Sequence, residues 1–396
     1  MIAYSDNQQQ AIDKLDKLKV GALFMRPGTG KTRVSLALVN SSDCDYCLFI
    51  VPFSTKGNLA NEINKWGINC QYDIVGVESL SNSDRIYLET LDKLNHSSKA
   101  FIVVDESLKI KNTTARRTKR VLKFANYATY RLVLNGTPVS KNLLDLWPQM
   151  EFLSPKILKM NQDQFKDTFC HYIQYRKYKP DGKLGKWKEF IKNYENLEYL
   201  YSLIRPYVFD ADLQLNSNKQ YVNIDYSIVA DREEYMGLRG NLIASLEYGD
   251  ADSFIKATQA MQHVYCAEPN KLRIIDKLID EKTIIFTKFI RSQDAVLDKF
   301  PQANVLTYGK GSFGLNLQQY NKIIFFDKTF DYAQRDQAEH RIYRMGQQED
   351  VTYYDLTGDV NLEYTIDQNI EYKQSLITEF KKLLNKGDEV NWQKII

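Results

Sequence analysis

The residues with the most evident chemical capability form the stretch MRPGTGKT at positions 25–32. Its glycines allow a tight turn in which backbone N–H groups converge on phosphate oxygens, and the helical spacing that follows adds the positive end of a helix dipole. In such a loop the lysine contacts the β- and γ-phosphates and the threonine binds Mg²⁺. A glycine-rich turn without a ligand is the alternative, but it does not explain the adjacent lysine and threonine. The predicted nucleotide ligands are Gly28, Thr29, Gly30, Lys31 and Thr32, although Met25 replaces the first glycine of the full pattern.

Two adjacent acids end the apolar run FIVVDE at positions 101–106. Asp105 would bind the metal ion and Glu106 would polarise the attacking water, which are the two tasks that Mg²⁺-dependent ATP hydrolysis gives to carboxylates. Two solvated acids at the end of an ordinary strand are the alternative. The phosphate-binding loop upstream argues against it, so Asp105 and Glu106 are predicted to be catalytic.

A third candidate group lies near the C-terminal end, in the stretch QAEHRIYR. Gln337, Arg341 and Arg344 are spaced i, i+4 and i+7, which places them on one face of a helix. Two arginines on one face can present forked donors to a phosphate, although a solvated basic face has the same spacing. His340 lies beside them without the spacing of a metal ligand.

Short apolar runs alternate with helical segments over residues 1–155, and the pattern returns after residue 216. Strands that alternate with helices predict an α/β fold of two doubly wound parallel sheets. The basic, aromatic segment between them predicts a helical and hairpin insertion, so the domains are 1–155, 156–215 and 216–396, the last with a helix over 363–385. Helices are also predicted near 231–248 and 252–281. The predicted strands are VGALFM (20–25), YCLFIV (46–51), DRIYLET (84–90), AFIVVDE (100–106), YRLVLNG (130–136), QYVNIDYSI (220–228), TIIFT (283–287), NVLTY (304–308), KIIFFD (322–327) and VTYYDL (351–356).

Residues 171–193 alternate aromatic and basic side chains around Pro180, Asp181 and Gly182. This turn signal predicts a β-hairpin that projects from the first lobe. Its lysines and aromatic rings suit a surface that follows a phosphate backbone and stacks on bases. A solvated hairpin whose rings pack on the lobe is the alternative. The candidate nucleic-acid ligands are Lys177, Lys179, Lys186 and Trp187.

Composition limits the class of protein further. The 396 residues carry a formal net charge of only +3, so a nucleic-acid site would have to be a local patch. The five cysteines are dispersed and lack the spacing of a zinc site, which indicates a reducing compartment. No apolar run approaches the about 20 residues of a membrane span, and no signal peptide opens the chain. We therefore expect a cytoplasmic protein without a membrane partner.

DESLKIKN at 105–112 resembles the DEAH-x-IKN box of the Snf-type (Swi/Snf-like) superfamily two DNA helicases and translocases. Other stretches resemble further motifs of that family in the same order, and together they cover nearly the whole chain. They are Gln8 at the head of the first helix, VPFSTKGNLANEINKW (51–66), RLVLNGTPVSKNLLDLWPQMEFLSP (131–155), TIIFTKF (283–289), GSFGLNL (311–317), IIFFDKTFDYAQRDQAEHRIYRMGQ (323–347) and YTIDQNIEYK (364–373). The resemblance implies two RecA-like lobes, ATP and Mg²⁺ as cofactors, and DNA as a partner.

The resemblance also implies roles for single residues. Gln8 is expected to read the adenine ring, and Arg341 and Arg344 are expected to enter the ATP site from the second lobe. The DNA-contacting residues that it implies are Pro52, Ser54, Thr137, Gly314 and Asn316.

The chain departs from the family pattern in two places, and its small size suggests a compact bacterial or phage form. Only about fifteen residues separate Arg291 from Val305, where the family usually has a further strand–helix unit, and the stretch RPYVFDADLQL is acidic where the family is often basic. We expect a monomeric DNA-dependent ATPase that translocates on DNA and remodels or branch-migrates duplex or branched DNA in replication, recombination or repair. The alternatives are a strand-separating 3′–5′ helicase and an ATP-gated DNA-binding or loading factor. A single-strand-binding protein is a candidate partner, and a phage-encoded form would act in the cytoplasm of its bacterial host.

Overall fold

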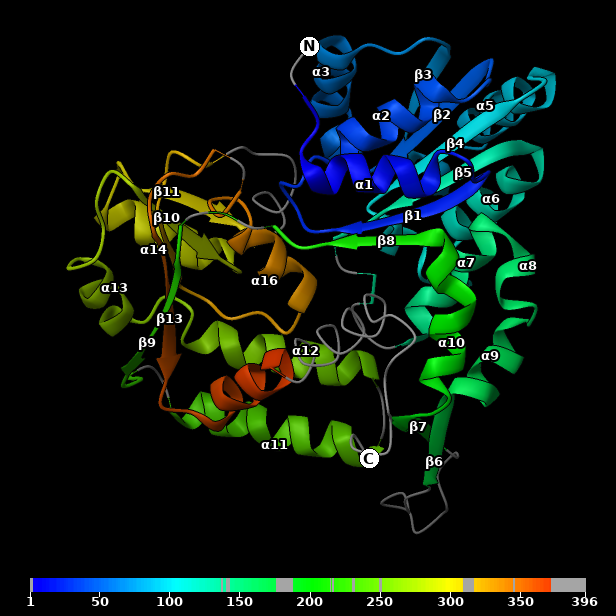
Figure 1. Ribbon diagram of the computed structural model, residues 1–396. Coiled ribbons are helices and arrows are strands. Elements are labelled where there is room, and N and C mark those ends of the chain that lie inside the picture. Colours follow the sequence, from blue (N-terminus) through cyan, green and yellow to red (C-terminus); the bar gives the residue numbers. More distant parts are fainter. Residues whose placement is uncertain are drawn as a thin grey trace. The chain divides into compact units, whose positions relative to one another are not determined.

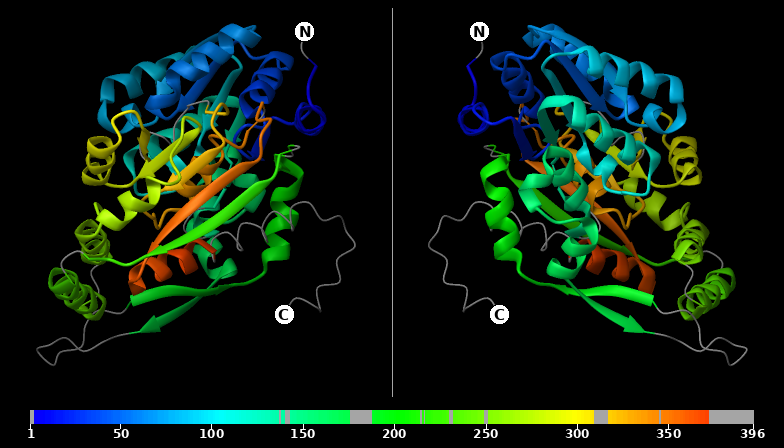
Figure 2. Two further views of the ribbon diagram at one scale, coloured as in Figure 1. Left: turned by 90° about the vertical axis from the view of Figure 1, so that its left-hand side faces the viewer. Right: turned by 90° about the vertical axis from the view of Figure 1, so that its right-hand side faces the viewer.

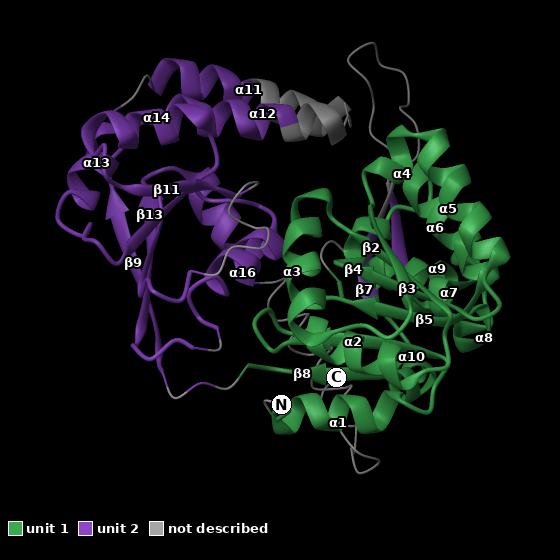
Figure 3. Cartoon of the chain, turned by 90° about the horizontal axis from the view of Figure 1, so that it is seen from above, with its two compact units in different colours: residues 1–170, 194–214, 373–396 green, residues 171–193, 215–372 purple. Residues whose placement is uncertain are grey.

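The computed structural model describes residues 3–136, 138–139, 143–175, 188–213, 215, 217–229, 232–248, 251–308, 317–344 and 346–371. The chain divides into two compact units, which Figure 3 shows in different colours. Unit 1 includes residues 1–170 and 194–214, and unit 2 consists of residues 171–193 and 215–372. The three-part division into 1–155, 156–215 and 216–396 stays a prediction.

Unit 1 is built on a six-stranded sheet with the order β3-β2-β4-β5-β1-β8, in which all neighbouring strands are parallel. Because parallel strands end at a common edge, the loops that follow β1, β2 and β4 are brought to one side of the unit. The strands are β1 (Val20–Met25), β2 (Tyr46–Val51), β3 (Gln71–Gly76), β4 (Ala100–Asp105), β5 (Ala128–Leu134) and β8 (Val208–Ala211).

Alternate residues of these strands enter two separate cores, one on each face of the sheet. Leu23 and Met25 of β1 pack with the first three long helices of the chain, whereas Ala22 and Phe24 pack with the later ones (Figure 1). The first set is α1 (Asp6–Leu15), α2 (Lys31–Ser41) and α3 (Lys56–Trp66). The second set is α4 (Ser79–Asn82), α5 (Asp84–His96), α6 (Arg116–Phe124), α7 (Trp147–Leu153), α8 (Pro155–Leu158), α9 (Gln162–Phe169) and α10 (Leu197–Ile204).

The strand predicted over residues 84–90 is wrong, because this segment is the first half of helix α5. The side chain of Ser83 accepts a hydrogen bond from the backbone N–H of Ile86 and caps the helix. Thr90 and Leu94 then bury one face, four residues apart, as an amphipathic helix requires. The strand on this side of the sheet is β3, which the sequence pattern did not predict.

Unit 2 contains a five-stranded parallel sheet with the order β11-β10-β12-β13-β9. Its longest pairing joins β9 and β13 over eight residue pairs, and these strands run side by side in Figure 2. The strands are β9 (Lys219–Tyr226), β10 (Thr283–Thr287), β11 (Asn304–Thr307), β12 (Lys322–Phe325) and β13 (Val351–Gly358). The helices are α11 (Arg232–Tyr248), α12 (Ala251–Val264), α13 (Pro269–Ile275), α14 (Ile290–Lys299) and α16 (Tyr332–Glu339). Two parallel α/β sheets confirm the predicted fold class.

A separate two-stranded sheet is formed by β6 (Cys170–Tyr175) and β7 (Lys188–Tyr194). These strands flank the predicted turn, and Lys177, Lys179, Lys186 and Trp187 lie outside the described residues. Of the helices in the described part of the chain, none combines the length and the apolar character needed to span a membrane.

Candidate active site

The predicted phosphate-binding loop connects the buried strand β1 to helix α2. Gly28 and Gly30 have φ angles of 84° and 82°, a region that residues with a side chain rarely adopt. Thr29 is buried, and its hydroxyl donates to the carbonyl oxygen of Arg26 at 2.7 Å. The loop is therefore held in a tight turn at the N-terminus of α2, which is where a helix favours an anion.

Lys31 lies at the first position of α2, and its ammonium group donates to the carbonyl oxygen of Met25 at 2.7 Å. Asp105, at the end of β4, is close enough for the charge of Lys31 to lower its pKa. Burial and the neighbouring charge of Glu106 outweigh this effect and raise the pKa of Asp105 from 3.8 to about 6. The structure thus brings together the lysine and the acid pair that the sequence placed 74 residues apart.

Asp105 and Thr32 fit the role of Mg²⁺ ligands that the sequence predicts. Both present hard oxygen donors, which Mg²⁺ prefers. The raised pKa of Asp105 shows that its carboxylate lies in surroundings that do not fully compensate a negative charge, as suits a site for a divalent cation. These residues are therefore a suitable donor set, and their metal binding stays a prediction.

Glu106 follows Asp105 with φ 50° and ψ 55°, the left-handed conformation. A side-chain-bearing residue adopts it at a cost of about 1 kcal/mol or more, and such strain is concentrated at functional sites. The backbone N–H of Glu106 donates to the carboxylate of Asp105 at 2.9 Å, and its carbonyl oxygen accepts from the N–H of Lys109. These contacts fix the turn that positions the Glu106 carboxylate.

Asp105→Asn is expected to stabilise the free protein at pH 7.5. Folding raises the pKa of Asp105 from 3.8 to about 6. Ionisation of Asp105 therefore lowers the free energy of unfolding as the pH rises from about 4 to about 6, and the full loss of stability is present above about pH 6. This shift corresponds to at most about 3 kcal/mol, and because Asp105 is partly exposed to solvent we expect a gain of about 1–2 kcal/mol. Urea unfolding at pH 7.5 and at pH 4 tests this, since the gain should shrink at pH 4. An equal effect at both pH values would contradict it.

Gln8 is buried against the phosphate-binding loop. Its side-chain amide donates to the carbonyl oxygen of Thr29 at 3.0 Å, and its side-chain oxygen accepts from the backbone N–H of Ser5 at 3.2 Å. A Cβ atom on Gly30 would lie 2.2 Å from the Gln8 amide nitrogen, so the glycine is needed for this close approach. Gln8 therefore links α1 to the loop, and its reading of adenine stays a prediction.

A buried polar chain connects the acid pair to the LNGTP stretch. The hydroxyl of Ser107 donates to the side-chain oxygen of Gln149 at 2.6 Å and accepts from the amide of Asn135 at 3.3 Å. The amide of Gln149 donates to the carbonyl oxygen of Pro138 at 2.8 Å. Buried polar groups with satisfied hydrogen bonds specify a unique arrangement, so these bonds fix the segment after β4 relative to the segment after β5. The sequence motifs assign no role to these residues, although Ser107 lies within DESLKIKN and Asn135 and Gln149 lie within the stretch 131–155.

The phosphate-binding loop is also tied to strand β8. The N–H of Arg26 donates to the carbonyl oxygen of Ala211 at 3.0 Å, and its guanidinium contacts the carboxylate of Asp212 at 3.1 Å. The acidic stretch that departs from the family pattern thus supplies a partner for the loop. Asp212 is largely exposed, which limits the strength of this ion pair.

In unit 2, Gln337 lies on α16, but this helix ends at Glu339. The prediction that Gln337, Arg341 and Arg344 share one helical face is therefore wrong, because the two arginines follow the helix in turns. The carbonyl oxygen of Glu339, the last residue of α16, accepts from the hydroxyl of Tyr353 on β13 at 3.0 Å and also from the backbone N–H of Tyr343 at 3.3 Å. Arg341 is buried and Arg344 is half-buried.

Helix α16 is anchored to the sheet of unit 2 by an arginine that is only slightly exposed. Arg335 contacts the carboxylate of Asp355 on β13 with two nitrogens, one at 2.7 Å, and its Nε donates to Glu339 at 2.8 Å. Its guanidinium also lies 3.4 Å from the ring centroid of Phe325. These contacts fix the position of the segment that carries Arg341.

The predicted nucleic-acid residues fall into two groups. Pro52 is buried and Ser54 is exposed, and both lie in the turn that follows β2. This turn and the phosphate-binding loop lie at the same edge of the unit 1 sheet. Thr137, Gly314 and Asn316 lie outside the described residues.

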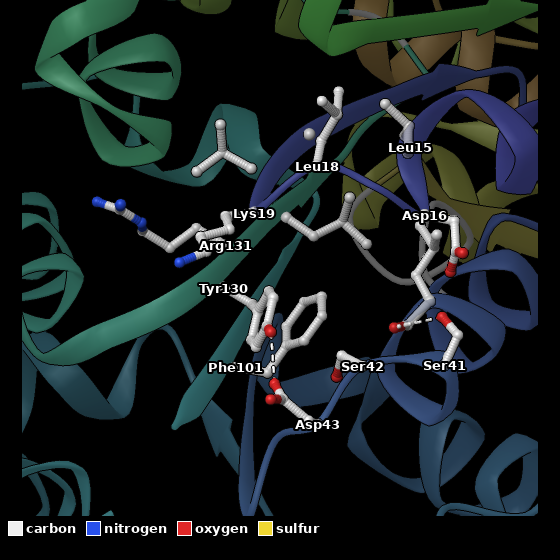
Figure 4. A pocket seen from close by; sticks show the side chains of 14 residues that line it. Leu15, Asp16, Leu18, Lys19, Ser41, Ser42, Asp43, Phe101, Tyr130 and Arg131 are labelled. Carbon is white, nitrogen blue, oxygen red and sulfur yellow. Dashed lines mark hydrogen bonds between the residues drawn. The ribbon is translucent and has the colours of Figure 1, made fainter. Parts of the chain in front are cut away.

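A cavity of about 230 Å³ lies at the other end of the strands (Figure 4). It is lined by Lys19 and Val20 at the start of β1, and the hydroxyl of Tyr130 points to Asp43 beside it. The hydrogen bond to Asp43 raises the pKa of Tyr130 to about 12. Ligands of parallel sheets bind beyond the carboxyl ends of the strands, so this cavity is distinct from the candidate site.

The chain is similar in sequence to ATP-dependent helicases and to subunits of chromatin-remodeling complexes. An uncharacterized ATP-dependent helicase of Mycoplasma genitalium is 24% identical over 442 residues, which cover 94% of this chain and 41% of the relative. The SWI/SNF chromatin-remodeling complex subunit snf22 of Schizosaccharomyces pombe is 22% identical, over 90% of this chain and 26% of the relative. The chain thus spans about two fifths of the length of the Mycoplasma helicase.

A solved structure, the Sulfolobus solfataricus SWI2/SNF2 ATPase core in complex with dsDNA, is 21% identical, with a TM-score of 0.45. The match covers 96% of this chain and 92% of that chain. The SNF2-related domain matches residues 12–228, which is more than half of the chain and includes the phosphate-binding loop and the acid pair. The resemblance seen in the sequence is confirmed, and the chain belongs to the family of SNF2-related domains.

Proposed function

We propose that this chain is a DNA-dependent ATPase motor that translocates on DNA and remodels or branch-migrates duplex or branched DNA. The observation that carries the proposal is the convergence of Lys31, Asp105 and Glu106 at one edge of the unit 1 sheet. A lysine at the start of a helix and an acid pair at the end of a strand are what ATP hydrolysis requires. The family membership supports the same function.

Each of these residues has a defined task in the reaction. Lys31 exchanges the carbonyl oxygen of Met25 for the terminal phosphates of ATP and neutralises their charge. Glu106 accepts a proton from the attacking water as it adds to the γ-phosphorus, while the bond from that phosphorus to the β–γ bridging oxygen breaks and ADP leaves. Mg²⁺, when bound by Thr32 and Asp105, supplies further positive charge at the phosphates. The chain of Ser107, Gln149 and Asn135 then transmits a change at the acid pair to the segment after β5.

We also propose a cellular role, a location and a partner for this activity. We expect a role in replication, recombination or repair, in the cytoplasm of a bacterium or of a phage host, with a monomeric protein that meets single-strand-binding protein on its DNA. A strand-separating 3′–5′ helicase and an ATP-gated loading factor are the competing functions. ATPase stimulation that grows with DNA length favours a motor over a loading factor.

Branched DNA is expected to stimulate ATP turnover more than blunt duplex DNA, and branch migration is expected to exceed unwinding of a tailed duplex. The reason is that a shortened second lobe retains the tracked strand but has less surface for the other strand. ATPase rates and products on matched blunt, tailed, forked and four-way DNA at one salt concentration test this. If only single-stranded DNA stimulates turnover and tailed duplexes are unwound best, the helicase function is correct instead.

The sheet formed by β6 and β7 gives a second prediction. Replacing Lys177, Lys179, Lys186 and Lys188 together by glutamine should weaken DNA binding and flatten its salt dependence, because each lost phosphate contact removes about one released counterion. Affinity for ATP should not change. The measurement is DNA affinity against salt concentration, with the quadruple variant of Lys17, Lys19, Lys65 and Lys99, all in unit 1, as a charge-matched control. An unaltered salt slope would place this segment off the DNA path.

A further inference from the structure

The thiols of Cys44 and Cys70 lie next to each other in unit 1. Their sulfur atoms are 3.5 Å apart, although 26 positions separate the two residues in the sequence. Both are half-buried, whereas Cys47, Cys170 and Cys266 are buried. A buried cysteine behaves as a small apolar residue, whereas a thiol that solvent can reach is open to oxidation. This pair therefore differs from the other three cysteines in its access to solvent.

The pairing of two strands brings these thiols together. Strands β2 and β3 are parallel neighbours, and their register pairs Tyr46 with Gln71. Cys44 precedes Tyr46 by two residues and Cys70 precedes Gln71 by one, so both thiols lie at the same end of adjacent strands. Neighbouring strands are about 4.8 Å apart, and the Cα atoms of a disulfide are about 4.4–6.8 Å apart. The sheet thus supplies the spacing that a disulfide requires.

Hydrogen bonds hold the segments on either side of the pair. The side-chain amide of Asn40, in α2, donates to the carbonyl oxygen of Gly67 at 3.2 Å, and its side-chain oxygen accepts from the N–H of Asn69 at 2.9 Å. The carboxylate of Asp45 accepts from the N–H of Lys99 at 3.0 Å. Both cysteines lie between helix and strand, so their loops can absorb the approach of about 1.5 Å that forms an S–S bond.

A small oxidant can reach the pair. Cys70 lines an open cavity of about 740 Å³ at the amino ends of β2 and β3, together with Asp45, Gln71 and His96 among others. Burial, followed by the hydrogen bond from Cys44, raises the pKa of Cys70 to about 12. The thiolate is the reactive form of cysteine, so the pair should react slowly rather than within seconds.

We propose that Cys44 and Cys70 form a redox-sensitive site that a hydroperoxide converts into a disulfide. The sulfur of one cysteine attacks the peroxide, whose O–O bond breaks, and this gives a sulfenic acid and, from hydrogen peroxide, one water. The sulfur of the other cysteine then attacks the sulfenic sulfur; the S–O bond breaks, the S–S bond forms and a second water leaves. The two thiols lose two electrons in total, which the peroxide gains, and a thiol reductant reverses the change.

The disulfide would connect the loop after α2 to the loop after α3. Helix α2 begins at Lys31 of the phosphate-binding loop, so the bond restrains the opposite end of the helix that carries this lysine. It also closes the chain from residue 44 to residue 70, which restricts the unfolded state and stabilises the folded one. This inference does not depend on the proposed motor function, because its readouts are thiols and unfolding rather than ATP turnover.

Hydrogen peroxide on the purified full chain, followed by unfolding and thiol titration, tests the proposal. The count should fall over hours from five thiols to three, and dithiothreitol should restore five. Peptide mapping without reductant should find Cys44 bonded to Cys70. The midpoint of urea unfolding should be about 1 M higher for the oxidised than for the reduced protein, because a disulfide that closes a loop of this length stabilises to that extent.

Cys44→Ser and Cys70→Ser should each abolish the bonded peptides and the rise in the urea midpoint. Cys266→Ala, in unit 2, is the control and should still lose two thiols and gain the same bonded peptides. Five thiols left in the wild type after prolonged exposure to peroxide would overturn the proposal, whatever the stability of the variants. A bond that uses Cys47 in place of either cysteine, or a disulfide that joins two molecules, would overturn it as well.

Discussion

Glu106→Gln is expected to retain ATP binding and to lower the steady-state ATPase rate by about 10²–10⁴-fold. Glutamine keeps the size of the side chain and the hydrogen bonds of the strained turn, but it cannot accept a proton from water. The backbone contacts of Glu106 with Asp105 and Lys109 involve only its N–H and carbonyl oxygen, so they survive the substitution. The loss should therefore affect the chemical step alone.

The measurement is ATP turnover at saturating DNA, together with equilibrium binding of a fluorescent ATP analogue. Lys31→Ala is the informative comparison, because it should lose turnover and also bind ATP more weakly. Asp73→Asn on the edge strand β3 is a matched acid-to-amide control within unit 1 and should behave as the wild type. A wild-type rate for Glu106→Gln would show that Glu106 does not act on the attacking water.

Arg344→Ala is expected to reduce ATP turnover by about 10³-fold or more if this residue acts as an arginine finger. Arg344 is tested in preference to Arg341, because Arg341 is buried and its removal would also disturb the packing of unit 2. Arg344→Lys should restore little activity, since an ammonium group cannot supply two parallel hydrogen bonds to a phosphate.

Thermal unfolding of each variant separates lost chemistry from lost stability. Arg273→Ala on α13 removes an exposed arginine from the same unit and serves as the control. If Arg344→Ala turns over ATP within a few-fold of the wild type, the arginine finger is located elsewhere in the chain.

Much of the sheet architecture was predictable because its strands are buried on both faces. YCLFIV is buried along its whole length and AFIVVD is buried up to its last residue, and both runs are strands in the structure. Strand β3 was missed because it lies at the sheet edge, where Gln71 and Tyr72 are exposed and the apolar run is short. Strand β8 was missed because it has only four residues, and more than 180 residues of sequence separate it from its partner β1.

Some features of the candidate site were also predictable from the sequence, and others were not. The turn at the glycine-rich loop and the position of the acid pair at a strand end were predictable, because backbone geometry requires particular residue types at fixed spacings. The end of α16 at Glu339 was not predictable, because the i, i+4 and i+7 spacing of Gln337, Arg341 and Arg344 continues beyond it. The hydrogen bond from Ser107 to Gln149 was also not predictable, because the two residues belong to different motifs.

The pairing of β8 with β1 has a mechanical consequence. The chain passes from unit 1 to unit 2 soon after β8, so a pulling force on that connection is applied to the end of this strand, and we consider its component along the strand axis. Its four parallel residue pairs with β1, from Ala22 and Val208 to Met25 and Ala211, are then loaded together in shear rather than one after another. Because Arg26 follows β1 and is bonded to Ala211, the strain would reach the phosphate-binding loop first. A motor built this way would sense an opposing load as a change in its affinity for nucleotide.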